Sequence, residues 1–188
     1  MKILVAYFTQ TGNTEQIADA IHGEVLAKGH DADLKRIDEL APDRLNDYDL
    51  IFLGSACHDT DLAKPVKRLL EKIPTPPSFK LAGFVTHATY TPGGGDRQRE
   101  VHKAWAGRCP QSYERVCRAK GIQWCGYFCC QGAPSAALEA FIHREIVTDA
   151  EEWKVYVAEV RQHPNEADKE KAREFARGVL AQSPKGAT

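Results

Sequence analysis

Three things are scarce in this sequence: long apolar runs, an excess of charge of either sign, and paired cysteine motifs. No apolar run approaches the roughly 20 residues that a membrane-spanning helix needs, so a membrane protein is not expected. The opening residues 1–8 are too short for a secretory signal peptide and lead into a polar, glycine-containing turn. Lysine and arginine (25) almost balance aspartate and glutamate (26), which leaves a net charge of −1. This balance argues against a nucleic-acid-binding protein, whose phosphate contacts call for a basic surplus.

The six cysteines carry no recognisable metal or redox spacing. No pair is spaced as Cys-x-x-Cys, and nothing signals export, so we predict reduced thiols in a cytoplasmic protein, packed as small apolar side chains. Strand periodicity predicts that Cys125 and Cys129 share one face of a strand and that Cys130 lies on the other. Five histidines show no metal-ligand spacing and are predicted to be surface residues: His22, His30, His102, His143 and His163. No metal site is predicted.

What the sequence has instead is five short apolar runs that alternate with helical or turn-like segments. The runs predict strands at residues 3–8, 33–37, 50–53, 81–85 and 122–130, the second of them polar enough for an edge strand. Helices are predicted at residues 17–26, 62–73, within 96–119 with an interruption at Pro110, and 164–180. Strands that alternate with helices indicate right-handed βαβ units and a parallel sheet covered on both faces. We therefore predict a doubly wound α/β fold.

The length of 188 residues is typical of one domain, and no linker or repeat divides it. We predict a single domain over residues 1–188. The segment 133–163 is longer than a simple connection between a strand and a helix. We expect an insertion there, helical in part at residues 136–146 and 151–160.

The most informative segment lies between the first strand and the first helix. It consists of Thr9, Gln10, Thr11, Gly12, Asn13 and Thr14. Hydroxyl and amide side chains, a glycine and a helix N-terminus together favour a bound phosphate, because N–H donors converge there and the helix dipole favours negative charge. The segment is neither a Walker loop nor a Gly-x-Gly-x-x-Gly fingerprint, and it contains no lysine or arginine.

This loop, preceded by Ile-Leu-Val-Ala-Tyr-Phe, resembles the phosphate loop of the flavodoxin family, Thr/Ser-x-Thr-Gly-Asn-Thr. The resemblance covers most of the chain and implies a five-stranded parallel sheet of order 2-1-3-4-5 with noncovalently bound flavin mononucleotide (FMN). It assigns the 5′-phosphate to the six residues of the loop at positions 9–14. Ligands in such sheets bind beyond the carboxyl ends of the strands, where the strand order reverses.

In the same family, the loops after the third and fourth strands enclose the flavin ring. The resemblance therefore assigns flavin contacts to Ser55, Ala56, Cys57, His58 and Asp59, and to Thr86, His87, Ala88, Thr89, Tyr90, Gly93 and Gly94. The first of these loops departs from the typical pattern, since it contains no tryptophan or tyrosine. Tyr90 is then the candidate for stacking on the ring, and His58 either stacks or is solvated. The run Gly93-Gly94-Gly95 resembles one in flavodoxin-like NAD(P)H:quinone reductases.

The leading interpretation is an FMN-binding electron-transfer protein that exchanges electrons with other redox proteins, and no general base is evident for any further catalysis. The alternative is an FMN-dependent NAD(P)H oxidoreductase that acts on quinones or similar acceptors. The triple glycine, the first flavin loop and the mild net charge favour this alternative. A redox-controlled sensor or assembly module is a third possibility. The oligomeric state stays open.

Overall fold

The computed structural model describes residues 1–182. A parallel sheet forms its centre, with strands in the order β2-β1-β3-β5-β6. These strands are β1 (Lys2–Tyr7), β2 (Asp31–Arg36), β3 (Leu50–His58), β5 (Lys80–His87) and β6 (Gln123–Gln131). A two-residue strand, β4 (Asp61–Leu62), pairs antiparallel with the end of β3. Counting the five parallel strands alone, the order is 2-1-3-4-5, so the predicted flavodoxin-like fold is confirmed.

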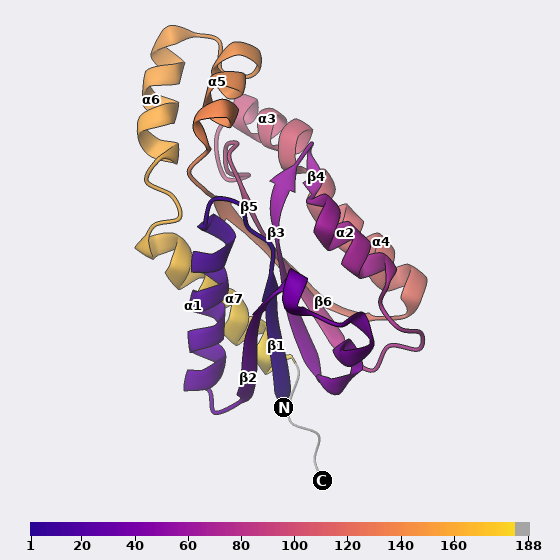
Figure 1. Cartoon of the computed structure of the whole chain (residues 1–188). Coiled ribbons are helices and arrows are strands. Elements are labelled where there is room, and N and C mark those ends of the chain that lie inside the picture. The colour runs from indigo at the N-terminus through magenta and orange to yellow at the C-terminus, as the bar shows by residue number, and fades with distance from the viewer. Residues whose placement is uncertain (183–188) are drawn as a thin grey trace.

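Helices cover both faces of the sheet (Figure 1). One face packs on α1 (Asn13–Ala27) and α7 (Glu166–Ala181), through a core that includes Ile17, Ile21 and Phe52. The other face packs on α2 (Lys64–Glu71), α4 (Arg108–Lys120) and two 3₁₀ helices, η1 (Ile37–Glu39) and η2 (Pro42–Asp47). The strands are apolar on both sides because both sides are covered. This arrangement leaves the carboxyl ends of the strands for a site.

A further group of helices lies at that end of the sheet. There α3 (Asp96–Ala106) follows β5, and α5 (Ala136–Glu145) and α6 (Ala150–Val160) follow β6 (Figure 1). We call residues 136–160 the helical cap. Its helices occupy the segments predicted to be helical within 133–163. The cap packs around a small apolar core of Ile142, Val147, Tyr156 and Val160, to which Tyr90 is added from the segment after β5.

Most element boundaries differ from the predictions by a few residues. β3 runs on to His58 and pairs with β4, and β5 includes Thr86 and His87. The helical stretch 96–119 breaks at Gly107 and not at Pro110. Pro110 is the third residue of α4, where a backbone N–H has no partner within the helix, so proline is accommodated. The predicted single domain reaches residue 188, and its last six residues lie outside the described range.

The predicted alternation of the cysteines on β6 is wrong, and a β-bulge explains why. The pairing of β5 with β6 shifts by one residue between Leu81 and Gly83, where Gly126 has φ 128°. An extra residue in one strand moves every later side chain to the opposite face. Cys125 and Cys130 therefore share the core under α1 and α7, whereas Cys129 packs against the core under α2 and α4.

All six cysteines are free thiols, as predicted. Within residues 1–182, no helix combines the length and the apolar character needed to cross a membrane.

Candidate functional site

The loop between β1 and α1 presents an uncapped helix N-terminus. Gly12 precedes α1 with φ 83°, a left-handed conformation that favours glycine, and no side chain caps the helix at this residue. The Gly12 N–H itself donates to Thr9 Oγ1 over 2.9 Å, which holds the loop in its turn. The first N–H groups of α1 are thus left without a side-chain acceptor, and the helix dipole makes this end favourable for an anion.

Asn13 ties the loop to the segment that leaves β6. Its Nδ2 donates to the carbonyl of Ala133 (2.8 Å) and to Thr11 Oγ1 (3.0 Å). Gly132 lies so close that a Cβ there would be 2.8 Å from Asn13 Nδ2, so only glycine fits. The two segments are therefore held together at one edge of the site.

Thr14 and Thr86 join the loop to β5 beneath the site. Their hydroxyl groups are 2.8 Å apart and both side chains are buried. Thr14 is consequently occupied by an internal hydrogen bond, and the phosphate-loop residues that face the cleft are Gln10, Thr11 and Asn13.

Two adjoining cavities lie between this loop, the ends of β3 and β5, and the helical cap. The smaller, about 80 Å³, is next to the loop at positions 9–14. The larger is about 270 Å³. Both are lined by Cys57, His87, Ala88 and Leu138, so they form one cleft at the carboxyl ends of the strands. This is where ligands bind in doubly wound sheets, at the reversal of strand order.

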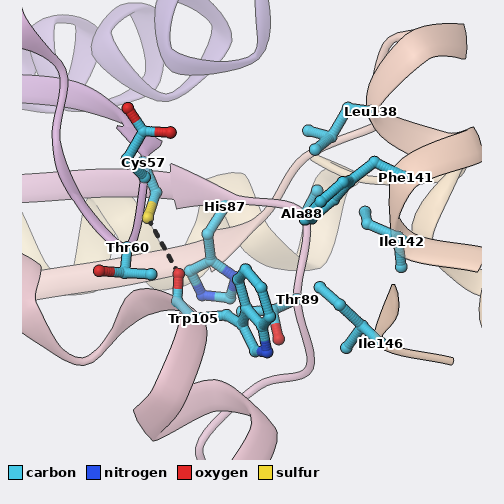
Figure 2. A pocket seen from close by; sticks show the side chains of 11 residues that line it. Cys57, Thr60, His87, Ala88, Thr89, Trp105, Leu138, Phe141, Ile142 and Ile146 are labelled. Carbon is cyan, nitrogen blue, oxygen red and sulfur yellow. Dashed lines mark hydrogen bonds between the residues drawn. The ribbon is translucent and has the colours of Figure 1, made fainter. Parts of the chain in front are cut away.

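The larger cavity is walled by apolar and aromatic side chains (Figure 2). Trp105 of α3 and Phe141 of α5 meet edge to face, with ring centroids 5.7 Å apart. Ile142 of α5 and Ile146, just beyond that helix, complete the wall on the cap side. A flat, largely apolar ring system matches this lining, since aromatic walls bury such rings well.

A few polar groups lie among these apolar side chains. Cys57 donates its thiol hydrogen to the carbonyl of Trp105, with an S···O distance of 3.4 Å (Figure 2). Thr89 Oγ1 and both ring nitrogens of His87 are buried without a hydrogen-bond partner. Burial lowers the pKa of His87 to about 3, so this ring is neutral near pH 7. Orphaned buried polar atoms in a cavity wall point to a ligand, because each costs about 1–3 kcal/mol if left unpaired.

The β3–β4 hairpin forms the side of the cleft opposite the cap. Its two turn residues, Asp59 (φ 49°) and Thr60 (φ 70°), both adopt left-handed conformations and line the larger cavity. A β-branched residue such as Thr60 rarely adopts this conformation, and such strain concentrates at functional sites. His58 lines the smaller cavity and meets Phe8 edge to face, with centroids 5.9 Å apart. Burial lowers the pKa of His58.

The structure brings most of the sequence-predicted residues to the cleft. Those that line it are Gln10, Thr11, Asn13, Ala56, Cys57, His58, Asp59, Thr86, His87, Ala88 and Thr89. Thr9, Gly12 and Thr14 shape the phosphate loop without lining a cavity. Ser55 is buried, donates to the carbonyl of Ala56 and accepts from the Ala63 N–H, so it braces the hairpin.

Tyr90, Gly93 and Gly94 are not brought to the cleft. Tyr90 is 6% exposed, packs edge to face on Tyr156 at 5.3 Å and donates to Glu152 Oε1 at 2.8 Å. Its ring therefore packs in the core beneath the helical cap. The prediction that Tyr90 stacks on the flavin is wrong. Gly94 faces the side chain of Gln98, and Gly93 has open space around it. These two glycines shape the entry to α3.

Sequence reasoning missed the residues that form the wall on the cap side: Trp105, Leu138, Phe141, Ile142 and Ile146. They come from a helix after β5 and from the insertion. The resemblance to the flavodoxin family assigned no site residues to either segment. The available signal was the aromatic pair itself, with Trp105 in an otherwise polar stretch and Phe141 in the predicted insertion.

Comparison with known proteins identifies the family. The sequence model of the flavodoxin domain matches residues 4–177, and the chain belongs to this family. An uncharacterized protein of Methanocaldococcus jannaschii is 28% identical over 185 residues, which covers 96% of this chain and 99% of that protein.

Solved structures agree on the fold. An archaeal flavodoxin superposes with a TM-score of 0.61 at 15% identity, covering 97% of this chain and 98% of that one. Oxidised flavodoxin 2 from Bacillus cereus superposes with a TM-score of 0.63 at 20% identity, covering 98% and 100%. At such identities the likeness extends to the fold, and the site has to be argued from its own residues.

Proposed function

We propose that this chain binds FMN in the cleft and transfers electrons between redox partner proteins. The observation that carries this proposal is the junction of an uncapped α1 N-terminus with an aromatic-walled cavity at the strand-order reversal. FMN has a phosphate, which suits the helix N-terminus, and a flat ring, which suits the aromatic-walled cavity. When bound, it supplies the redox chemistry, and the protein supplies binding, orientation and electrostatics.

The residues of the cleft divide this task. The N–H groups at the start of α1 bind the phosphate without help from a cationic side chain. Trp105 and Phe141 bury the ring and keep water from its face. Thr89 lines the same cavity, and its unpaired hydroxyl would hydrogen-bond the polar edge of a bound ring.

The phosphate assignment is tested with a matched pair of glycine variants on α1. Gly12 and Gly29 flank this helix, both have positive φ (83° and 72°), and a Cβ at either meets nothing within 4 Å. Alanine costs about 1–2 kcal/mol of backbone strain at each position. We expect Gly12→Ala to weaken FMN binding tenfold or more (~1.4 kcal/mol) and Gly29→Ala to leave it unchanged. Flavin fluorescence titration measures both.

Riboflavin, which lacks the phosphate, provides the ligand-side control. The wild-type chain should bind FMN at least about 100-fold more tightly than riboflavin, since charge-assisted hydrogen bonds contribute ~1.5–3 kcal/mol each. Gly12→Ala should leave riboflavin affinity unchanged. Equal affinity for the two flavins, or equal losses in Gly12→Ala and Gly29→Ala, would reject the phosphate site.

A second candidate function is an FMN-dependent NAD(P)H oxidoreductase for quinones or similar acceptors. The observation that favours it is the contribution of α5, whose Leu138, Phe141 and Ile142 extend the cavity with apolar surface beyond the strand ends. Anaerobic reduction of the FMN-loaded protein separates the two candidates. Electron uptake in two separate one-electron steps favours the carrier. Uptake in a single two-electron step, with NAD(P)H-dependent quinone reduction that Phe141→Ala impairs, favours the enzyme.

A further inference from the structure

Three potential metal ligands converge beside the cleft from three different elements. His87 ends β5, His102 lies on α3, and Cys129 lies on β6. One nitrogen or sulfur atom from each side chain lies within 4.8 Å of those of the other two. The register explains the convergence: Cys129 pairs with Val85, two residues before His87, so Cys129 and His87 project from the same face of the sheet.

Of the three side chains, His87 gives the strongest indication of a bound ligand. It is 4% exposed and neither of its ring nitrogens has a hydrogen-bond partner. Native proteins rarely leave such atoms unpaired, because the cost is about 1–3 kcal/mol for each. Burial and, to a smaller extent, the adjacent His102 lower its pKa to about 3, with the backbone of Thr89 acting in the opposite direction. The ring is therefore in the neutral form, which is the form that binds metals.

A hydrogen bond to the backbone fixes the tautomer of His102. Its Nδ1 lies 2.8 Å from the carbonyl oxygen of Tyr90. Because a carbonyl only accepts, Nδ1 carries the proton and Nε2 keeps its lone pair. Metal-binding histidines commonly donate their other ring N–H to a carbonyl in this way, which fixes the ring and its tautomer. The His87 and His102 rings lie edge to face with centroids 4.8 Å apart.

Two imidazoles and a thiol form a donor set suited to a borderline-soft d-block cation. Zinc binds nitrogen at ~2.0–2.1 Å and sulfur at ~2.3 Å, so neighbouring ligand atoms in a tetrahedral site are ~3.3–3.6 Å apart. Atoms at the observed limit of 4.8 Å have to move closer by about 1.2–1.5 Å, within reach of side-chain rotation. Three protein ligands plus one open position are typical of reactive zinc sites.

We propose that His87, His102 and Cys129 bind Zn²⁺ or a cation of the same class, with the fourth position left to water or a small ligand from the adjoining cavity. Within the described residues, the group has no fourth histidine, cysteine or acidic member. Binding forms two N–metal bonds and one S–metal bond, and the Cys129 thiol releases its proton to solvent.

The test is a Co²⁺ titration of the full-length chain, reduced, chelator-treated and free of flavin. We expect one equivalent of Co²⁺ to produce visible d–d bands and a thiolate-to-cobalt charge-transfer band, both abolished by Zn²⁺. Cys129→Ser should remove the charge-transfer band. His102→Gln, at a partly exposed position, should weaken Co²⁺ binding by more than the ~10–100-fold that loss of an outer-shell partner costs.

The neighbouring cysteine provides a matched control. Cys130 follows Cys129 on β6 but projects into the opposite core, so Cys130→Ala should keep the full cobalt spectrum. Circular dichroism and thermal unfolding verify that each variant folds. A wild-type chain without the charge-transfer band, or a band that survives Cys129→Ser or disappears in folded Cys130→Ala, would overturn the metal site. Such a result would mean that water satisfies His87. No flavin is present, so the outcome is independent of FMN binding.

Discussion

At the scale of single residues, the hydroxyl pair of Thr14 and Thr86 shows how a binding motif also serves the fold. The motif resemblance assigned both residues to the cofactor. In the structure their hydroxyl groups bond to each other in a buried position between α1 and β5. This hydrogen bond joins the phosphate loop to the strand that carries His87.

This pair predicts a non-additive double-mutant cycle. Thr14→Val or Thr86→Val alone leaves a buried hydroxyl unpaired and should lower the free energy of unfolding by about 1–3 kcal/mol. The double variant replaces both partners by apolar groups of the same shape, and should be much less destabilised than the sum of the two. Urea denaturation of the flavin-free chain measures all three. Exposed Thr11→Val, expected within about 0.5 kcal/mol of wild type, is the control, and simple additivity would contradict the pairing.

At the scale of elements, one carboxylate links the helical cap to α3 and to the chain after β5. Glu152 of α6 accepts from Tyr90 Oη (2.8 Å) and from Arg97 of α3 at Nε and Nη2, with the Nη2 distance 2.9 Å. The Tyr156 hydroxyl adds a hydrogen bond to the carbonyl of Ala88. The cap thus binds the chain just after β5, so the wall of the larger cavity depends on these contacts.

The Glu152 contacts predict a pH-dependent contribution to stability. Arg97 lowers the pKa of Glu152 below its usual 4.5, burial opposes this, and the Tyr90 hydrogen bond reinforces it. A depressed carboxyl pKa stabilises the fold above the unfolded-state pKa, and this stability is lost as pH falls through the folded-state pKa.

Glu152→Gln should therefore lower the free energy of unfolding by about 0.5–1 kcal/mol at pH 7, a value kept small because the ion pair is partly exposed. The difference from wild type should shrink below pH ~4.5. Glu151→Gln, at the adjacent and more exposed carboxyl, is the control and should change stability by no more than ~0.3 kcal/mol. Denaturation at pH 7 and pH 3.5 measures both, and a Glu152 effect independent of pH would refute the ionic contribution.

The same elements show which parts of the structure could be predicted from sequence. The buried strands and the helix α1 follow local rules of periodicity and turn chemistry, so their places along the chain were predicted. The strand order followed from the resemblance of the loop at positions 9–14 to the flavodoxin family. The bulge at Gly126 was not predicted, because it arises from pairing between β5 and β6. The place of Tyr90 was not predicted either, since its partner Glu152 is 62 residues away along the chain. The His87, His102 and Cys129 cluster is non-local for the same reason, and no spacing rule could find it.

At the scale of the whole molecule, the cleft joins elements that lie far apart along the chain. The phosphate loop, the β3–β4 hairpin, the end of β5 and the helical cap each contribute to it. A ligand that touches all of them binds the folded state and has no comparable site in the unfolded chain. Its binding free energy therefore adds to the stability of the fold.

Thermal unfolding should accordingly respond to FMN. At a free FMN concentration 100 times its dissociation constant, the gain in stability is about 2.7 kcal/mol. For a chain of 188 residues, about 2–4 °C per kcal/mol corresponds to a rise in Tm of roughly 5–10 °C. Differential scanning calorimetry with FMN, and with riboflavin at the same concentration, measures this rise. Riboflavin should give the smaller shift, and Gly12→Ala should reduce the FMN shift toward it while Gly29→Ala keeps it. A Tm that FMN leaves unchanged at millimolar concentration would mean that the cleft binds another ligand.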